Sequence, residues 1–264
     1  MNEVYTLENA PQDAAIIGGK GLSLHKMITA GFSVPPGIVL PQGFDLQMNH
    51  KTVLDAFDAQ NAPLVAVRSS AVMEDSDTAA WAGQLLTELN VTREGLIDAI
   101  RRCQTSGSSA QAQSYAAQHG IEAGGVAVVI QQMVQSEVSG VAFSVHPVTH
   151  DSSVVIIEAG LGLGEAIVSG EITPDTYLVK KHSAEIKERH ISVQEKALKR
   201  EGNITSYRSL GEMGSTQKLP DKVITQLASV VEKLEVFEGR PVDVEWAFAT
   251  GKLYITQCRP ITTV

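Results

Sequence analysis

The sequence predicts an α+β fold in one domain, and three observations support this prediction. Strand-type runs and amphipathic helices are mixed along the chain without the strict βαβ repeat of a doubly wound sheet. The 264 residues are enough for one large domain or for two lobes around a cleft. No internal repeat or low-complexity linker divides the chain. We therefore expect one domain over residues 1–264, with approximate lobes 1–130 and 131–264.

The first half of the chain mixes short strands and helices. An apolar run at 14–17 reaches a Gly-Gly-Lys-Gly turn at 18–21, and a helical pattern then continues to Gly31, a typical stop signal. The elements expected after it are a rigid turn at 34–37, strands at 38–40, 64–67, 85–91 and 125–131, helices at 52–59 and 94–102, and a polar loop at 105–113.

The second half is richer in strands. The elements expected there are strands at 138–144, 153–158 and 176–180, a glycine loop at 160–164, and a charged stretch of unclear structure at 183–200. An amphipathic helix is predicted at 221–237 from its apolar spacing. Strands at 242–249 and 252–257 then form a hairpin whose turn is Thr250-Gly251.

Composition and charge exclude several classes of function. Hydrophobic residues make up 43% and charged residues 19%, which is typical of a soluble globular protein. The net charge of -9 argues against a nucleic-acid surface, so an anion site must concentrate its cations locally. Cys103 and Cys258 match no metal or disulfide pattern. Without a signal-peptide pattern or a long apolar run, the expected location is the cytoplasm.

Two cations near turns and strand ends are candidate phosphate ligands. Lys20 lies in the Gly-Gly-Lys-Gly turn, where backbone amides and an ammonium at a helix start suit a phosphate. The spacing is not that of a Walker A motif, and on local evidence a solvated lysine is the simpler interpretation. Arg68 ends a buried strand and has a planar fork suited to phosphate. A structural ion pair with Glu74 or Asp75 explains Arg68 equally well.

Three further motifs are weaker. The Trp-Ala-Gly-Gln segment at 81–84 is small enough to close over phosphates, although a plain turn is preferred locally. The Gly-Leu-Gly-Leu-Gly-Glu segment at 160–165 lacks the G-x-G-x-x-G spacing of a dinucleotide site. His146 and His150 flank a short segment that is better explained as a polar loop than as a metal pair.

The last hairpin carries the most informative pattern. Asp243 and Glu245 are two apart on one strand, as are Gln257 and Arg259 on the next, so each pair faces one side. Two carboxylates and an amide oxygen suit Mg²⁺. Arg259 beside them would bind the phosphates that the metal bridges. An internally neutralised cluster of Asp, Glu and Arg is equally consistent with the pattern.

Five segments in one order resemble a known family. The resemblance is to the N-terminal ATP-binding domain of phosphoenolpyruvate synthase, pyruvate phosphate dikinase and rifampicin phosphotransferase. The matching segments are IIGGKGLSLHKMITAGFSVPPGIVL, VAVRSSAVMEDS with WAGQ, IQQMVQSEVSGVAFSVHPVT, VVIIEAGLGLGEAIVSGEITPDTYLV and VDVEWAFATGKLYITQCRPIT. Together they cover nearly the whole chain from Gly18 to Thr262.

The resemblance implies an ATP-grasp fold with ATP held between two lobes, and it assigns roles to matching residues. Lys20 and Arg68 would contact the ATP phosphates, and Glu158 would make a polar contact to the nucleotide. Gly83 and Gln84 would belong to a loop that covers the phosphates. The hinge strand along the adenine would comprise Gln131, Gln132, Met133 and Val134.

The resemblance also assigns the metal site. Glu245 and Gln257 would hold Mg²⁺, Asp243 would support them, and Arg259 would stabilise the transferring phosphate. Lys20, Arg68 and Arg259 would thus be the catalytic cations. Because phosphoryl transfer depends on positioning and charge neutralisation, this set of groups suits it.

The implied reaction is of the dikinase type. A phosphoryl or pyrophosphoryl group would pass from Mg²⁺-ATP to a histidine on a separate domain or subunit, with AMP and phosphate as products. The final acceptor would be a small molecule, pyruvate-like or an alcohol. The swivelling phosphohistidine domain and the substrate domain of the family are absent from these 264 residues, and the stretch between Gly37 and Leu64 is shorter than expected.

Two alternatives stay open. A free-standing ATP-grasp kinase or ligase would bind its small-molecule acceptor directly. A non-catalytic ATP-binding module would regulate a partner, although the complete set of Lys20, Arg68, Glu245, Gln257 and Arg259 argues against loss of catalysis.

Overall fold

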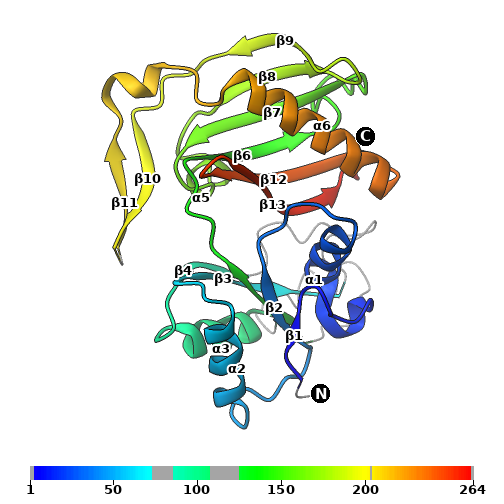
Figure 1. Ribbon diagram of the computed structural model, residues 1–264, viewed down its shortest axis with the longest axis vertical. Coiled ribbons are helices and arrows are strands. Elements are labelled where there is room, and N and C mark those ends of the chain that lie inside the picture. The colour runs from blue at the N-terminus through cyan, green and yellow to red at the C-terminus, as the bar shows by residue number, and fades with distance from the viewer. Residues whose placement is uncertain (1–2, 73–85, 108–124, 203, 263–264) are drawn as a thin grey trace. The chain divides into compact units, whose positions relative to one another are not determined.

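The computed structural model describes residues 3–72, 86–107, 125–202 and 204–262, and it divides the chain into two compact units (Figure 1). The first unit is Met1–Met133 and the second is Val134–Val264. The boundary lies slightly later than the predicted 130/131, because strand pairing in the first unit continues through Gln132. Helices combined with antiparallel sheets confirm the α+β class.

The first unit is built on a five-stranded antiparallel sheet with strand order β1-β2-β5-β3-β4. Its strands are β1 (Tyr5–Thr6), β2 (Gly37–Leu40), β3 (Val65–Ser70), β4 (Thr87–Val91) and β5 (Ala127–Gln132). Its helices are α1 (Ala14–Thr29), α2 (His50–Ala59) and α3 (Leu96–Ser106).

Helices cover both faces of this sheet (Figure 1). One face carries α2 and α3 over a buried apolar core that includes Val67, Ile100 and Ile130. The other face carries α1, where a Cβ added to Gly21 would lie 3.6 Å from both Val39 and Val129. Since side chains alternate between faces, Arg68, which pairs with Val129, lies on the α1 face.

Helix α1 is two helical segments joined at a kink. Asp13 caps the first segment by accepting a hydrogen bond from the Ala15 amide at 2.8 Å. Gly18, with φ of 72° and ψ of 167°, interrupts the helix. The predicted turn at 18–21 is therefore wrong beyond Gly18, because the next residues are already helical.

The second unit is built on a six-stranded antiparallel sheet with strand order β13-β12-β6-β7-β8-β9. Its strands are β6 (Val138–Phe143), β7 (Val154–Leu161), β8 (Asp175–Lys180), β9 (Glu185–His190), β12 (Val242–Ala249) and β13 (Lys252–Pro260). A separate two-stranded ribbon consists of β10 (Lys196–Glu201) and β11 (Ile204–Ser209), and the helices are α5 (Glu165–Val168), the 3-10 helix η1 (Gly211–Ser215) and α6 (Asp221–Glu238).

Helix α6 lies along one face of the six-stranded sheet (Figure 1). Its buried stripe is Val223, Ile224, Leu227, Ala228, Val231 and Leu234. This stripe confirms the predicted amphipathic helix, which is one residue longer than predicted. The Lys181 ammonium fastens α6 to the end of β8 by binding the Glu235 carboxylate at 2.6 Å.

A buried ion pair fixes the segment that leads into α6. The Lys218 ammonium lies 2.9 Å from Asp175 Oδ1, and both side chains are fully buried. The Tyr177 hydroxyl donates to Asp175 Oδ2 at 2.7 Å, and the Ser192 amide donates to Oδ1 at 3.0 Å. A buried carboxylate needs this number of partners to offset its lost hydration.

Several predicted boundaries are corrected by the structure. The strand predicted at 64–67 extends through Ser70, so Arg68 lies inside β3. The helix predicted at 94–102 runs to Ser106 and takes in the start of the predicted polar loop, whose part beyond Gly107 lies outside the described residues. Strand β7 includes Gly160, and the charged stretch at 183–200 contains β9 and most of β10.

Within the described residues, no helix is both long enough and apolar enough to cross a membrane.

Candidate functional site

Lys20 is buried in the first unit and not solvated. The residue lies two positions after the kink in α1 and is 4% exposed. Its ammonium donates to the Ser69 carbonyl at 3.1 Å. The end of β3 also holds the neighbouring helical backbone, because the Gly19 amide donates to the Ala71 carbonyl and the Gly21 amide donates to Ser70 Oγ. The simpler interpretation as a solvated lysine is therefore wrong.

Arg68 lies on the same face of the sheet and is 7% exposed. Its Nη1 donates to Gln131 Oε1 on β5 at 3.2 Å. The alternative partners considered for it, Glu74 and Asp75, lie outside the described residues. The first unit thus places two buried cations, Lys20 and Arg68, on one face of its sheet.

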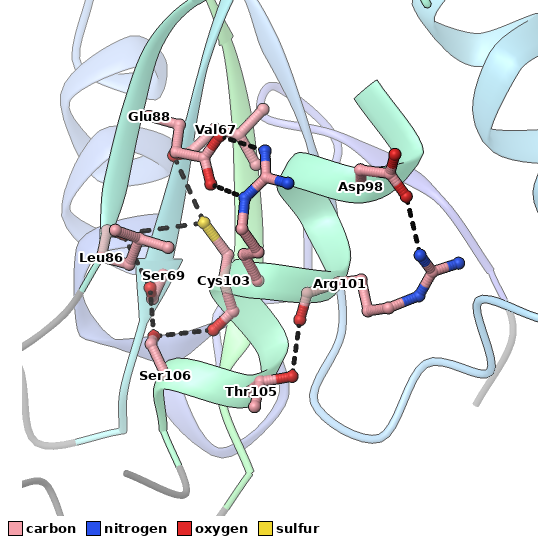
Figure 2. A network of polar contacts seen from close by, with 10 residues as sticks. Val67, Ser69, Leu86, Glu88, Asp98, Arg101, Cys103, Thr105 and Ser106 are labelled. Carbon is pink, nitrogen blue, oxygen red and sulfur yellow. Dashed lines mark hydrogen bonds and ion pairs between the residues drawn. The ribbon is translucent and has the colours of Figure 1, made fainter. Parts of the chain in front are cut away.

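A hydroxyl and thiol cluster supports β3 from the opposite face, as Figure 2 shows. Ser69 Oγ donates to the Leu86 carbonyl at 2.7 Å and lies 2.9 Å from Ser106 Oγ. Cys103 Sγ donates to the Val67 carbonyl at 3.5 Å, and burial raises the pKa of this thiol to about 11. Because the Ser69 carbonyl also receives Lys20, this cluster fixes the strand segment that binds the ammonium.

The sequence did not identify this cluster. Ser69 lies beyond the predicted strand 64–67, and Cys103 and Ser106 lie beyond the predicted helix 94–102, so no predicted element linked them. A signal that could have identified it is the apolar spacing of Leu96, Ile100 and Cys103, which extends the helix past residue 102 and places Cys103 on its buried face.

The predicted hinge residues span the point in the sequence where the first unit ends and the second begins. The Gln132 amide donates to the Pro36 carbonyl at 2.8 Å, and the Met133 amide donates to the Leu64 carbonyl at 3.0 Å. Val134 is the first residue of the second unit, and its carbonyl accepts from the Ser136 amide at 3.0 Å. Gly83 and Gln84 of the predicted covering loop, together with Trp81, lie outside the described residues.

The final hairpin brings the four predicted residues together in the second unit. Asp243 pairs with Arg259 and Glu245 pairs with Gln257 in the β12–β13 register. Directly paired residues share a face of an antiparallel sheet, so all four side chains lie on one face. Arg259 Nη2 lies 3.2 Å from Asp243 Oδ2 and 3.3 Å from Glu245 Oε1.

The hairpin has two irregular features that suit this arrangement. Thr250 and Gly251 have φ of 50° and 76°, as a tight two-residue turn requires, and this confirms the predicted turn. A bulge at Glu245 and Trp246 leaves Thr256 as an extra residue on β13. Bulges of this kind re-aim side chains and are frequent beside active sites.

Glu158 belongs to the same face of the second sheet. The register places Glu245, Val141 and Glu158 in one row across β12, β6 and β7. Burial, and then the Asp243 carboxylate, raise the pKa of Glu158. Burial is also the main cause that raises the pKa of Asp243, while Arg259 opposes this and Glu245 adds to it. Two carboxylates, Asp243 and Glu245, therefore contact the guanidinium of Arg259, and Glu158 lies on the same face of the sheet.

The donor set fits a hard divalent cation. No group of three His, Cys, Asp or Glu side chains in the described part of the chain has the arrangement of a metal site. The candidate set instead combines Asp243, Glu245 and the amide oxygen of Gln257, which are the oxygen donors that Mg²⁺ prefers. Asp243 Oδ1 is buried and has no hydrogen-bond partner in the structure. Burying an oxygen without a hydrogen-bond partner costs free energy unless a ligand such as a cation binds to it.

The glycine segment at 160–164 is hydrogen-bonded to other segments of the second unit. Gln194 Oε1 accepts from the Leu161 amide at 2.8 Å, and its Nε2 donates to the Leu161 carbonyl at 2.9 Å. Ser139 Oγ donates to the Gly162 carbonyl at 2.6 Å, and the Leu163 amide donates to the Leu198 carbonyl at 2.9 Å. This segment therefore anchors strand β10, a role that the G-x-G spacing did not reveal.

His146 and His150 form a local turn. His146 Nδ1 accepts from the Val148 amide at 3.1 Å and from the Thr149 amide at 3.2 Å. The His150 amide donates to the His146 carbonyl. These contacts support the interpretation as a polar loop.

Residues 45–264 match the family described as the pyruvate phosphate dikinase AMP/ATP-binding domain. The probable phosphoenolpyruvate synthase of Methanocaldococcus jannaschii is 32% identical, over 97% of this chain and 26% of the relative. The phosphoenolpyruvate synthase of Pyrococcus furiosus is 40% identical, over 83% of this chain and 28% of the relative. The rifampicin phosphotransferase of Bacillus cereus is 39% identical, over 75% of this chain and 23% of the relative.

The chain thus spans about a quarter of the length of these curated relatives. Among solved structures, the D-alanine–D-alanine ligase of Bacillus anthracis complexed with ATP has a TM-score of 0.43 at 12% identity. That likeness covers 91% of this chain and 53% of the ligase chain, and it is too low to decide the fold by itself.

Proposed function

The chain belongs to the family of pyruvate phosphate dikinase AMP/ATP-binding domains, and we propose that it binds Mg²⁺-ATP and transfers a phosphoryl or pyrophosphoryl group to a histidine on another domain or subunit. The products from ATP would be AMP and phosphate. The relatives are several times as long as the chain, which covers about a quarter of each, and this supports acceptor and substrate domains outside it. The final acceptor would be a small molecule, as the names of the relatives indicate for them.

The observation that carries this proposal is the cluster of Asp243, Glu245, Gln257 and Arg259 on one face of the second sheet. Asp243, Glu245 and Gln257 would hold Mg²⁺, and the unpartnered Asp243 Oδ1 is a site for it. A bound Mg²⁺ neutralises phosphate charge. Arg259, held by two carboxylates, would stabilise the negative charge of the phosphoryl group during transfer.

The remaining proposed roles are contacts to the phosphates, the nucleotide and the adenine. Lys20 and Arg68 would bind phosphate oxygens, because both are buried cations on the α1 face of the first sheet. Lys20 donates to the Ser69 carbonyl and Arg68 donates to the Gln131 amide. Glu158 would contact the nucleotide from the same face as Asp243. Gln132, Met133 and Val134 would line the adenine, and Gly83 and Gln84 would cover the phosphates.

The test is product analysis with ATP labelled at the β and γ positions. The chain is incubated with Mg²⁺ and the label, alone and with the phosphohistidine domain of a relative. We expect AMP and a labelled histidine only when that domain is present. Turnover of ATP with a small molecule and no histidine domain would instead identify a free-standing kinase or ligase. Tight ATP binding without transfer to any acceptor would identify a regulatory module.

A further inference from the structure

Gln131 occupies a constrained place at the centre of the first sheet. It lies on β5, where its backbone is paired with Gly37 of β2 on one side and with Ala66 of β3 on the other. The residue is 2% exposed. A buried amide at a central strand position is costly unless both of its ends are hydrogen-bonded, and here both are.

One end of the Gln131 amide accepts a hydrogen bond and the other end donates one. Oε1 accepts from Arg68 Nη1 at 3.2 Å, and Nε2 donates to the Pro35 carbonyl at 3.3 Å. A guanidinium can only donate and a carbonyl can only accept. The amide therefore has one workable orientation, because the flipped amide would place like groups against each other at both ends.

The support behind Gln131 is rigid. Pro35 and Pro36 have fixed φ angles, and the Pro36 carbonyl is held by the Gln132 amide at 2.8 Å. Gly37 lies so close to β5 that a Cβ there would lie 2.8 Å from the Ile130 carbonyl oxygen and 3.0 Å from Gln131 Cα. The Pro35 carbonyl is thus a fixed point from which Gln131 reaches Arg68.

We propose that Gln131 is a positioning residue that fixes the Arg68 guanidinium for phosphate binding and is not itself an adenine contact. Its amide is neutral, so it orients the guanidinium without cancelling the positive charge that a phosphate needs. A carboxylate at the same position would orient Arg68 as well but would compete with the phosphate. The inference rests on the proposed function in one respect, the role of Arg68 as a phosphate ligand.

The experiment compares the affinities of the full chain for Mg²⁺-ATP and for adenosine by calorimetry. Adenosine carries the base and the ribose without phosphates. In Gln131→Met, which keeps the size of the side chain but neither hydrogen bond, we expect ATP binding to weaken about 10-fold, the loss typical of a hydrogen bond to a charged group. Adenosine binding should stay within about 2-fold of the original, since no base contact is lost.

A double-mutant cycle isolates the contact with Arg68. In the Arg68→Ala background, Gln131→Met should weaken ATP binding by no more than about 2-fold, because the group that it positions is gone. Gln104→Met is the matched control. It removes an amide that donates to the Phe44 carbonyl at 3.1 Å in the same unit without touching Arg68, and it should leave both affinities unchanged.

A second variant, Gln131→Glu, is used if Gln131→Met is too unstable for binding measurements. If Gln131→Met lowers the unfolding midpoint so far that binding cannot be measured, Gln131→Glu provides the test. Its added charge should weaken ATP binding by at least about 10-fold, because it neutralises Arg68, and should leave adenosine binding unchanged.

The outcomes separate this inference from the proposed function. ATP affinity unchanged in the Gln131 variants, while Arg68→Ala weakens it, would overturn the positioning role alone. Equal losses of ATP and adenosine affinity in a folded Gln131 variant would show a base contact and overturn it too. Unchanged ATP affinity in Arg68→Ala would overturn both the role of Arg68 and this inference, and absence of ATP binding by the original chain would refute the proposed function.

Discussion

At the residue scale, the ion pairs of Arg259 contribute little to the stability of the fold. Its side chain is 25% exposed, and those of its partners Asp243 and Glu245 are 24% and 22% exposed. Ion pairs with this access to water contribute little to folding, at most about 1 kcal/mol. One guanidinium nitrogen, Nη2, nevertheless contacts both carboxylates. These contacts hold the positive charge of Arg259 beside the proposed metal site.

Replacing Arg259 should separate function from folding. We expect Arg259→Ala to slow transfer of label from ATP to the histidine domain by at least about 100-fold, because a ligand of the transferring phosphate is lost. Glu245→Ala should have a similar effect through the metal. The unfolding midpoint should change by only a few degrees in either variant.

The control for these variants is Arg208→Ala. Arg208 forms an exposed two-point ion pair with Glu201 on the β10–β11 ribbon, at 3.0 and 2.6 Å. Its loss should leave the transfer rate unchanged. Near-normal transfer in Arg259→Ala or Glu245→Ala would show that the proposed site is wrong.

Cys103 should make stability depend on alkaline pH. Burial raises the pKa of its thiol from the ordinary value of 9.0 to about 11. Between these values the unfolded chain loses the thiol proton and the folded chain keeps it. The stabilisation is therefore complete below pH 9 and is lost as the pH rises to about 11, by roughly 3 kcal/mol.

Urea unfolding at several pH values between 8 and 11 tests this prediction. The free energy of unfolding of Cys103→Ala should be lower at pH 8, because a cavity is left, and should fall less steeply above pH 9. Parallel pH profiles for the two proteins would contradict the assignment of the effect to Cys103.

At the element scale, the kink in α1 depends on one glycine. A Cβ at Gly18 would lie 2.1 Å from Ser70 Oγ and 2.3 Å from the Ser70 carbonyl oxygen. Its φ of 72° with ψ of 167° also belongs to a region that only glycine adopts readily. The close approach of strand β3 to the kink is what allows Ser70 and Ala71 to accept the helix amides.

Substitutions at two glycines of α1 should therefore differ sharply. Gly18→Ala should destabilise the first unit by about 3–5 kcal/mol through overlap and backbone strain. Gly21→Ala should be neutral or stabilising by up to about 1 kcal/mol, since that residue is helical and an added Cβ meets ordinary contacts of 3.4–3.6 Å. Urea unfolding of both variants measures the difference, and equal effects would contradict the structural account of the kink.

Sequence reasoning succeeded at this scale where the information is local. The β12–β13 hairpin, with Asp243, Glu245, Gln257 and Arg259 on one face, follows from the period of two and a turn signal. Helix α6 follows from its apolar spacing, and β2 follows from an apolar run after two prolines. Each of these patterns lies within about 20 neighbouring residues, which is the range that periodicity covers.

It failed where distant segments decide the structure. The continuation of β3 through Arg68 and the helical geometry of Lys20 arise because Ser70 and Ala71 meet α1, which lies about 50 residues earlier. The hydrogen bond from Arg68 to Gln131 joins residues 63 positions apart. Strand β11 was missed because its charged and polar residues carry no apolar alternation.

At the scale of the whole molecule, each unit has a core of its own. In the first unit, fully buried Leu96 and Ile100 pack under the sheet, and in the second unit, fully buried Leu227 and Val231 pack on theirs. Separate cores predict separate cooperative unfolding.

Calorimetry on two core variants tests this independence. Leu227→Ala should destabilise the second unit by about 2–5 kcal/mol, and Leu96→Ala should do the same in the first. We expect each variant to lower one of two transitions and to leave the other within about 2 °C of its original midpoint. A single transition that both variants lower together would show that the two units unfold as one.

The chain passes from the first unit to the second only once, between Met133 and Val134. Mechanically, the two units are therefore connected in series. A force applied to the two ends of the chain passes through both units. Pulling a single molecule should give two separate rupture events, each releasing about 45 nm of extended chain, and the order of rupture would report which unit resists tension less.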